Sequence, residues 1–350
     1  MKNNGPERRF STTLLAIALV FTGLLASACV EKTDQIEWKW QFNVFGYDDA
    51  PAAEFFLKGV IPNVKERTNG EFQIVPYFSK DLGLDAGNYP KALASGMIDM
   101  AWVYPGYFAS DVPTIQICML WMMYRDFESY KVASDLSKPY HQKGYDKAYR
   151  NTVKLGAVGP YNWVIMATRK PFPSVRDWSG LKIRVPDDAS QRSLKAMGAT
   201  GVIIPWVDSI PAVHQGLVDG VSNSLDEMTK LKFYEMTDHL YLFNMLSAEH
   251  HTLISNSSFE ELPAEYREIL MDELKKAEDE SWERVLGANR DHNDAIEVWR
   301  ENGATVHEIT DEDFEYIRNR MKSAWKAQTD LFKKDAPDLL AKVYEALNIE

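Results

Sequence analysis

The sequence contains few cysteines and few long apolar runs, and both shortages limit what the chain can be. Only two of its 350 residues are cysteine, Cys29 and Cys118. No apolar stretch after the first segment approaches the ~20 residues that cross a bilayer, so no later membrane span is expected. Several enzyme signatures are also absent: G-x-S-x-G, G-x-G-x-x-G, the phosphate-binding loop and H-E-x-x-H. The sequence therefore offers no catalytic site of these kinds.

Basic residues are outnumbered as well. The chain has 39 Lys and Arg against 51 Asp and Glu, which gives a formal net charge of -12. Nucleic-acid binding requires a basic surface, so a nucleic-acid partner is disfavoured. A small anionic ligand responds to local charge and is not disfavoured. The length is sufficient for two domains with separate cores, and the apolar content of 45% is that of a soluble globular protein.

The first 29 residues have the pattern of an export signal. In order, they contain the basic residues Lys2, Arg8 and Arg9, an apolar run over 14–25, and the small residues Ala26-Ser27-Ala28 before Cys29. This run is too short for a stable span, so the pattern predicts a signal peptide and a periplasmic mature protein. Two cleavage modes remain open, because Ala26-x-Ala28 suits ordinary removal and Cys29 suits a lipid-anchored lipoprotein. If Cys29 is lipidated or cut away, Cys118 is the remaining free cysteine, in an apolar run that predicts buried packing.

Periodic segments predict an α/β protein with two lobes. Strands are expected over 36–45, 72–78, 181–185, 202–204, 221–225 and 304–309. Helices are expected over 50–68, 188–197, 208–215, 230–236, 263–302, 311–334 and 337–347. The segment 263–302 predicts one long helix or two in line, and at ~1.5 Å per residue such a helix would reach across both lobes.

A short internal similarity supports two lobes of the same construction. The segment 92–101, ALASGMIDMA, is similar to 212–221, AVHQGLVDGV. In each, a helix ends at a glycine, and two apolar residues and an aspartate lead into a strand. The alternative is chance similarity between two short helix-to-strand junctions.

Few polar residues suggest a site when taken one by one. Arg184 lies near the carboxyl end of an expected strand, where open α/β sheets bind ligands, and its planar fork can hold a carboxylate. A solvated arginine is the alternative. The run Glu249-His250-His251 is the candidate metal cluster, but adjacent histidines on a strand point to opposite faces, which favours a structural role.

Taken together, several segments resemble the DctP-type solute-binding proteins of tripartite ATP-independent periplasmic (TRAP) transporters. The matching segments, in family order, are Thr168-Arg169, Gly180-Leu-Lys-Ile-Arg184-Val-Pro, Met197-Gly198-Ala199, Gly216-Leu-Val-Asp219-Gly220 followed by Asn223, Lys232-Phe-Tyr-Glu, Ile254-Ser-Asn256 and Leu262-Pro263. The resemblance covers the mature chain in outline and is strongest from Arg169 to Pro263.

The resemblance implies a carboxylate-binding site formed by three residues. Arg184 matches the arginine that pairs with the ligand, Arg169 matches a second arginine that assists, and Asn223 matches the asparagine that closes on the same carboxylate. Such a site binds and supplies no base or nucleophile. Two departures, Ser222 in place of a common Glu and Ile210 in place of a common Tyr, suggest fewer hydroxyl partners.

Aromatic residues near these positions are expected to enrich the pocket in rings. They are Trp102, Tyr104, Tyr161, Trp163 and Trp206. Core packing is the alternative role for them.

The implied fold is a type II-like periplasmic binding protein that closes on its ligand like a Venus flytrap, with hinge strands and a lobe-spanning helix. The expected lobes are 36–166 plus 249–290 and 167–248 plus 291–350. The implied function is capture of a small organic carboxylate, without a cofactor, and its delivery to the membrane subunits of a TRAP transporter; a monomer is expected. Two alternatives remain: an exported metal-dependent enzyme using Glu249, His250 and His251, and an ABC-type solute-binding protein.

Overall fold

The computed structural model describes residues 38–44, 53–78, 81–245, 248–286 and 293–349. The expected signal peptide and Cys29 lie outside these residues. Within the described ranges, no helix combines the length and the apolar character that crossing a membrane requires.

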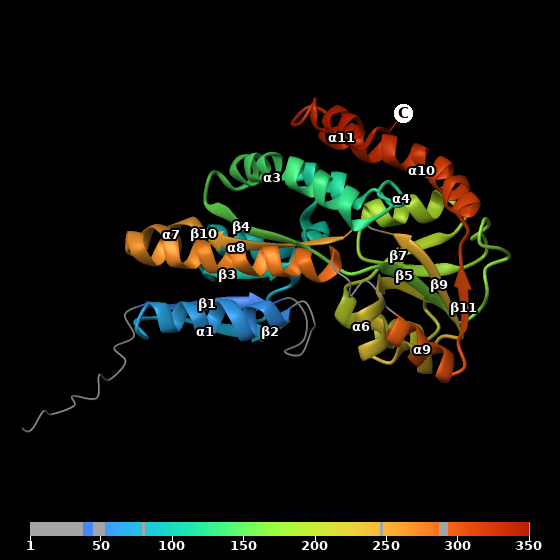
Figure 1. The fold of residues 1–350 in the computed structure, drawn as a ribbon, viewed down its shortest axis with the longest axis horizontal. Coiled ribbons are helices and arrows are strands. Elements are labelled where there is room, and N and C mark those ends of the chain that lie inside the picture. The colour runs from blue at the N-terminus through green and yellow to red at the C-terminus, as the bar shows by residue number, and fades with distance from the viewer. Residues whose placement is uncertain (1–37, 45–52, 79–80, 246–247, 287–292, 350) are drawn as a thin grey trace, which may run out of the picture. The chain divides into compact units, whose positions relative to one another are not determined.

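The first sheet has five strands in the order β2-β1-β3-β10-β4 (Figure 1). Its strands are β1 (Trp38–Val44), β2 (Phe72–Phe78), β3 (Met100–Val103), β4 (Val153–Pro160) and β10 (Glu249–Ser255). β1 pairs in parallel with β2 and β3, and β10 pairs antiparallel with β3 and β4. In β1 Trp40, Phe42 and Val44 are buried, Trp38 is half-buried, and Asn43 is buried as well.

The second sheet has six strands in the order β11-β9-β5-β8-β6-β7. Its strands are β5 (Val164–Thr168), β6 (Lys182–Val185), β7 (Thr200–Ile203), β8 (Gly220–Ser224), β9 (His239–Met245) and β11 (Thr305–Glu308). β6 is parallel to β7 and β8, and β5 is antiparallel to β8 and β9. The expected lobe boundary at residue 166 falls within β5, which lies wholly in this sheet.

The internal similarity corresponds to two matching junctions. Gly96 and Gly216 end the preceding helices with φ of 71° and 68°, a left-handed conformation that glycine adopts without strain. In the first sheet an Asp99 carboxylate oxygen accepts a hydrogen bond from the Gln41 amide at 2.7 Å. In the second sheet Asp219 accepts one from the Lys182 amide at 2.9 Å. The two sheets are thus built alike, as the repeated segment predicts.

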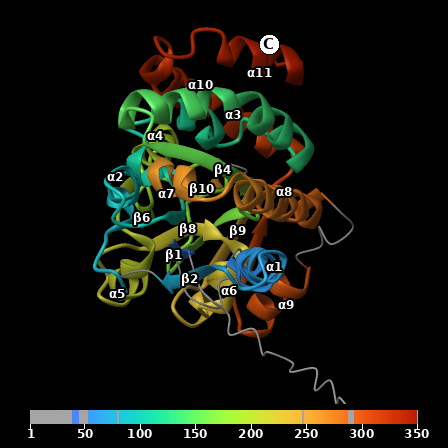
Figure 2. The same ribbon diagram turned by 90° about the vertical axis from the view of Figure 1, so that its left-hand side faces the viewer.

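Helices cover the two sheets. They are α1 (Ile61–Arg67), α2 (Tyr89–Ala94), α3 (Phe127–Tyr149), α4 (Asp188–Ala196), α5 (Ser209–His214), α6 (Leu225–Lys230), α7 (Asn256–Glu261), α8 (Ala264–Leu286), α9 (Asn293–Glu301), α10 (Asp311–Phe332) and α11 (Leu339–Leu347). α3 and α8 pack on β4, and α4 packs on β7. The last two helices return over the molecule, where α10 packs on α4 and α11 on α3 (Figures 1 and 2).

The segment expected as one long helix or two in line contains two described helices. α8 packs on β4 of the first sheet, whereas α9 packs on α6 and β11 of the second. Residues 287–292 between them lie outside the described part of the chain. A second difference is the helix expected over 230–236, which is a 3₁₀ turn over 233–235. The α-helix begins earlier, directly after β8, because the Ser224 side chain accepts from the Glu227 amide at its first turn.

The chain passes between the sheets at two further places. Residues 161–163 connect β4 to β5, and the connection from β9 to β10 includes Ala248. These two connections are hydrogen bonded to each other, since the Tyr161 amide donates to the Ala248 carbonyl at 3.0 Å. Both Tyr161 and Ala248 also line the pocket described next.

Candidate ligand-binding site

A pocket lies where the two sheets and their connections meet. The space between its walls amounts to about 650 Å³, counting the part that is open to solvent. Residues of the first sheet and the segment after β3 line one side: Trp102, Tyr104, Tyr107 and Trp121. Residues that follow or belong to the strands of the second sheet line the other: Arg184, Ser190, Trp206, Ser222, Asn223 and Glu227. The pocket therefore joins parts of the chain that lie far apart in sequence.

Arg184 is the cationic residue of this wall, and it is almost fully buried, with 1% of its surface exposed. Its position follows from β6, which runs between β7 and β8 and carries Arg184 opposite Val202 and Val221. Its Nε donates to the Ile204 carbonyl at 2.7 Å and its Nη1 to the Ser222 carbonyl at 3.2 Å. These two bonds fix the plane of the guanidinium.

The remaining nitrogen of Arg184, Nη2, has no hydrogen-bond partner among the described residues. Burial lowers the pKa of the guanidinium, and the nearby Tyr107 and Asp187 partly offset that effect. An arginine side chain stays charged at neutral pH all the same. A buried cation that lacks a full set of partners is costly, and a carboxylate is the group that a guanidinium binds best. The geometry therefore suits an anionic ligand.

Two polar residues of β8 lie beside this cation. Ser222 and Asn223 follow Val221, the residue opposite Arg184, and both line the pocket. Asn223 is only partly buried, so its amide can reach a ligand. Strand pairing thus brings Arg184 and Asn223 together although 38 residues separate them.

Aromatic rings form the opposite side. Trp102 lies in β3, and Tyr104 is the first residue after that strand. The ring centroids of Trp102 and Tyr104 lie 5.9 and 6.2 Å from that of Tyr161. The Tyr104 hydroxyl donates to a carboxylate oxygen of Asp187, the residue that caps α4. This bond joins the first-sheet side of the pocket to the second-sheet side.

Two indole nitrogens of this pocket lack partners. Nε1 of Trp102 and Nε1 of Trp206 are buried, and neither donates a hydrogen bond to any described residue. The ring of Trp206 stacks on Phe233 with centroids 5.2 Å apart, and the guanidinium of Arg184 lies 5.3 Å from its centre. Two neighbours, Phe233 and Arg184, therefore hold the ring of Trp206 in place.

The structure brings six of the eight expected site residues to this pocket. They are Arg184, Asn223, Trp206, Tyr104, Tyr161 and Trp102. Sequence reasoning did not single out Tyr107, Trp121, Ser190 or Glu227, which also line it. Tyr107 lies in a 3₁₀ turn over 105–108 whose position no sequence pattern fixes. Ser190 and Glu227 follow helix caps, and that placement was the available signal.

The other two expected residues, Arg169 and Trp163, do not line the pocket. Arg169 is exposed and its Nη1 donates to the Val213 carbonyl at 3.3 Å. Its backbone amide binds the Asp219 carbonyl, so it lies at the start of β8, whereas Asn223 lies near the end. Trp163 packs edge-on against Phe127, with centroids 5.0 Å apart.

The expected metal cluster is divided by the strand that carries it. His250 lies beside Trp102, with ring centroids 4.9 Å apart, and packs so closely on Gly159 that a Cβ there would lie 2.4 Å from its Cε1. Glu249 and His251 lie on the other side of β10, where His251 Nε2 is 2.7 Å from a Glu249 carboxylate oxygen. The opposite orientation of the two histidines is thus confirmed, and the three residues do not surround one point.

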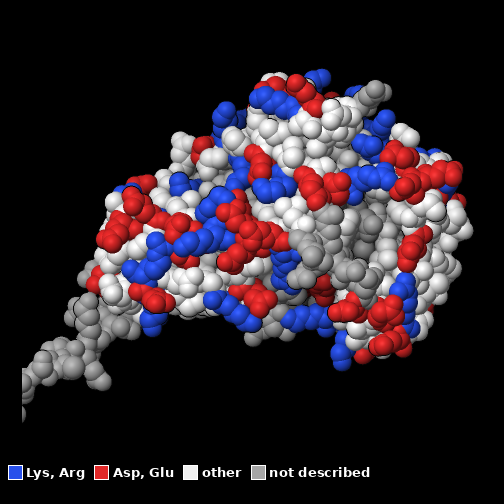
Figure 3. Space-filling model, viewed as in Figure 1, with Lys and Arg blue, Asp and Glu red and all other residues white. Residues whose placement is uncertain are grey.

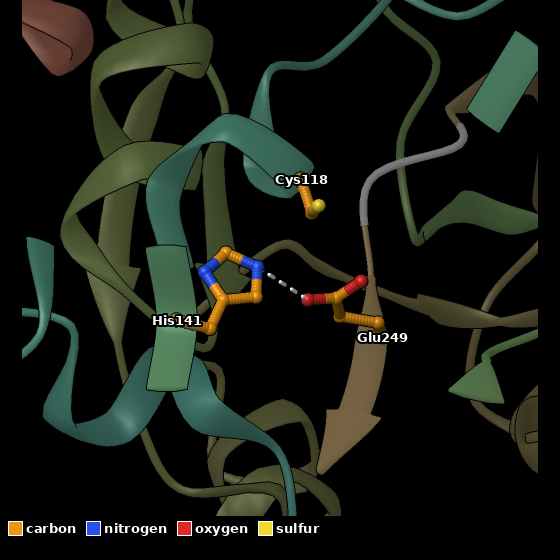
Figure 4. A group of neighbouring side chains, drawn as sticks. All are labelled: Cys118, His141 and Glu249. Carbon is orange, nitrogen blue, oxygen red and sulfur yellow. Dashed lines mark ion pairs between the residues drawn. The ribbon is translucent and has the colours of Figure 1, made fainter. Parts of the chain in front are cut away.

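A different trio could offer ligands to a metal ion. Single ligand atoms of Cys118, His141 and Glu249, all buried, lie within 4.8 Å of one another (Figure 4). Burial raises the pKa of the Cys118 thiol well above its usual value, and the Glu249 charge raises it further. Burial also acts to raise the pKa of Glu249, but hydrogen bonds and charge from His141 and His251 outweigh it and hold that pKa low. Cys118 is thus a buried thiol, as its apolar context predicts.

Acidic and basic side chains are interspersed on the molecular face shown in Figure 3. Among the described residues, exposed pairs of opposite charge include Lys131 with Asp135 and Arg125 with Asp311. Such pairs contribute little to stability. The pattern on this face is that of a mixed, solvated surface.

Comparisons with known proteins agree with this geometry. The family whose sequence model matches residues 52–332 is described as bacterial extracellular solute-binding protein, family 7 (DctP). The chain is 22% identical over 325 residues to the sialic acid-binding periplasmic protein SiaP of Vibrio cholerae serotype O1, which covers 90% of this chain and 94% of that protein.

Solved structures show the same fold. A TRAP periplasmic solute-binding protein from Desulfovibrio salexigens with bound orotic acid matches with a TM-score of 0.79 and 22% identity, over 88% of this chain and 98% of that one. One from Ralstonia eutropha H16 with bound (S)-2-acetolactate matches with a TM-score of 0.80 and 19% identity, over 89% and 99%. The expected two-lobe α/β fold is confirmed.

Proposed function

Because the chain belongs to family 7 of the bacterial extracellular solute-binding proteins, we propose that its pocket captures a small organic carboxylate for a TRAP transporter. The protein is an extracytoplasmic solute-binding receptor and not an enzyme, which sets aside the metal-dependent enzyme and the ABC-type protein as alternatives. It works with TRAP membrane subunits. The nature of its ligand and the residues that hold it are proposals.

Arg184 carries the proposal. A guanidinium that is 1% exposed and has one nitrogen without a partner is a feature that binding a carboxylate would explain. Nη2 donates to one carboxylate oxygen, and the Asn223 amide donates to the same group. The aromatic residues Trp102, Tyr104, Tyr161 and Trp206 enclose the body of the ligand. Arg169 and Trp163, which lie outside the lining, have no direct role in this proposal.

The two sheets are proposed as two lobes that close on the ligand. The lobes correspond to 36–166 plus 249–290 and 167–248 plus 291–350, except that the whole of β5 belongs with the second sheet and residues 161–163 make the crossing. The bond from Tyr104 to Asp187 supports closure, because it ties the two sides of the pocket together directly. We also propose that Cys29 carries a lipid, which mass spectrometry of the mature N-terminus tests. The protein is proposed to be a monomer, which analytical sedimentation tests.

A ligand screen tests the proposed function. Purified mature protein is heated with a panel of small carboxylates and with their uncharged amides, and the hits are measured by calorimetry. Ligand binding to the folded state raises the melting temperature. At least one carboxylate is expected to bind, and its amide is expected not to. A panel in which amides bind as tightly as the acids would overturn the assignment of an anion site.

The Arg184→Ala substitution tests the role of the cation. Loss of a buried charge-assisted pair weakens binding by ~2 to 5 kcal/mol, measured by calorimetry with the best ligand. Asp311→Ala, which removes an exposed acidic residue of α10, is the matched control and leaves the affinity unchanged. Unchanged affinity in Arg184→Ala would contradict the proposal.

A further inference from the structure

The pocket has an excess of nitrogen donors. Three buried nitrogens of lining residues have no partner among the described residues: Nη2 of Arg184, Nε1 of Trp102 and Nε1 of Trp206. Guanidinium and indole nitrogens donate and never accept. Buried polar groups in folded proteins nearly always have a partner, so this pocket requires acceptors from what it binds.

The neighbouring hydroxyl groups do not reverse that excess. Tyr104 donates its hydrogen to Asp187, and Ser190 donates to the same carboxylate at 3.1 Å. Both oxygens thus have a partner already and do not require a donor. The Tyr107 oxygen accepts a bond from the Trp206 amide at 3.3 Å and also interacts with the Arg184 guanidinium. The hydroxyls of Tyr104, Ser190 and Tyr107 therefore do not require a hydrogen from the ligand.

The pocket wall offers few hydrogen-bond acceptors. Glu227 lines the pocket, but it also lines the adjoining one together with Arg284, so it stands at the boundary between them. Asn223 offers both a donor and an acceptor and is neutral in this balance. A ligand amine has Glu227 as its charged partner, which makes amino acids the informative competitors.

From this balance we infer that the ligand is a carboxylate whose other polar atoms are acceptors that carry no hydrogen, with 2-oxo acids as the simplest class. The inference rests on the proposed function, since it takes the carboxylate at Arg184 as given. One carboxylate oxygen accepts from Arg184, and the oxo oxygen accepts from an indole nitrogen. The hydroxyl oxygen of a 2-hydroxy acid can accept the same bond, but its hydrogen then needs an acceptor, and few are left in this wall. The ammonium group of a 2-amino acid has three hydrogens at pH 7 and cannot accept from the indole nitrogen.

Matched trios of acids test the inference. Each trio consists of the 2-oxo, 2-hydroxy and 2-amino acid on one carbon skeleton, from two carbons up to a phenyl-substituted three-carbon chain. Affinities are measured by calorimetry on the mature protein at pH 7. In the skeleton that binds best, the oxo acid is expected to bind at least about tenfold more tightly than the hydroxy acid, the effect of about one hydrogen bond.

Two substitutions locate the effect. Trp102→Phe and Trp206→Phe remove an N–H and keep an aromatic ring, and at least one of them is expected to reduce the oxo-to-hydroxy preference to about twofold or less. Trp299→Phe is the matched control, because its Nε1 already donates to the Thr229 hydroxyl at 2.8 Å and Trp299 does not line the pocket. It leaves the preference unchanged.

The outcomes separate this inference from the proposed function. A hydroxy or amino acid that binds as tightly as its oxo partner overturns the inference, while the carboxylate site stands. The same holds if both Phe variants keep the full preference, because the indole donors then play no part. If no acid of any trio or of the wider carboxylate panel binds, the proposed function fails and the inference fails with it.

Discussion

The first sheet, taken as β2-β1-β3-β10-β4, and the second, taken as β7-β6-β8-β5-β9, place their strands in the same order and in the same relative directions. β11 is the additional strand at the edge of the second sheet. The aspartates that precede β3 and β8 bind the neighbouring strand in the same way. Side chains at corresponding positions can therefore be compared directly.

Corresponding positions carry different chemistry. Asn43 of β1 corresponds to Arg184 of β6, because each pairs with the second residue after the aspartate. Trp102 corresponds in the same way to Ser222. At these positions the second sheet supplies the charge and the first supplies the ring of Trp102, while Trp206 adds a ring from the second-sheet side. The backbone arrangement is common to both halves, and the binding chemistry depends on a few side chains at the carboxyl ends of the strands.

The antiparallel strands differ as well. His251 pairs with Val103 in the first sheet, and Ile165 pairs with Asn223 at the corresponding place in the second. His250 accordingly corresponds to Val164. The buried titratable cluster belongs to one half of the molecule, so sensitivity to acid is expected to reside there.

The largest expected effect on stability comes from placing an arginine in the first sheet at the position that corresponds to Arg184. Asn43 is fully buried, and an arginine there would bury a longer, charged side chain where a short neutral amide stands. Asn43→Arg should lower the free energy of unfolding by ~3 to 5 kcal/mol. Denaturant unfolding measures this, with Asn43→Met as a control of similar length without the charge. A variant as stable as the control would show that this position tolerates a cation and that the two halves are interchangeable.

The next effect concerns pH and the first sheet. Burial lowers the pKa of His250 from 6.5 to about 3. Folded His250 is then neutral down to about pH 3, while the unfolded chain binds a proton below pH 6.5, so stability present above pH 6.5 is lost as the pH falls toward 3. Between pH 7 and pH 5 this group accounts for ~2 kcal/mol.

His250→Gln removes that contribution. Denaturant unfolding at pH 7 and pH 5 should show a smaller loss of stability in the variant than in the unmodified protein. Val164→Ala, at the corresponding place in the second sheet, serves as the control and keeps the full pH dependence. Equal losses in His250→Gln and the unmodified protein would mean that other groups account for the acid sensitivity.

A smaller effect tests whether the two junctions are equivalent. Asp99→Ala leaves the Gln41 amide and the Ser258 hydroxyl without their acceptor, whereas Asp219→Ala affects the more exposed Lys182 amide. Expected losses in the free energy of unfolding are ~2 kcal/mol for Asp99→Ala and ~1 kcal/mol for Asp219→Ala. The Asn variants keep an acceptor oxygen and should recover part of each loss. If Asp99→Ala leaves the free energy of unfolding unchanged, this hydrogen bond does not stabilise the first junction.

Local patterns predicted much of this fold. The strand expected over 36–45 and the repeated glycine and aspartate at the two junctions each depend on neighbours in sequence, so a single segment contains the information. α3 is different, because Pro139 and Gly144 lie inside it and both residues disfavour a helix. Tertiary packing on β4 and α11 offsets that local cost, and packing is not visible in one segment.

The site was predicted less completely than the fold. Arg184 and Asn223 belong to segments with a family resemblance, whereas Tyr107 and Trp121 reach the pocket through 3₁₀ turns and loops. Which residues of such segments line a pocket depends on how the two halves meet. The burial of Arg184 also depends on how the two halves of the molecule pack together. Strand alternation alone would place its side chain on a solvated face of β6.

The smallest expected effect concerns Arg169, the residue that directly follows β5. Its amide binds Asp219 as the Ser255 amide binds Asp99, so its backbone corresponds to a position that in the first sheet carries a serine. The guanidinium is exposed and contacts the Val213 carbonyl, away from the pocket lining. Arg169→Ala should therefore change ligand affinity by no more than about twofold and stability by no more than about 0.5 kcal/mol. Calorimetry compares the ligand affinities of Arg169→Ala and Arg184→Ala. A tenfold loss of affinity in Arg169→Ala would show that closure of the lobes brings this side chain to the ligand. The second sheet would then contribute two cations to the site.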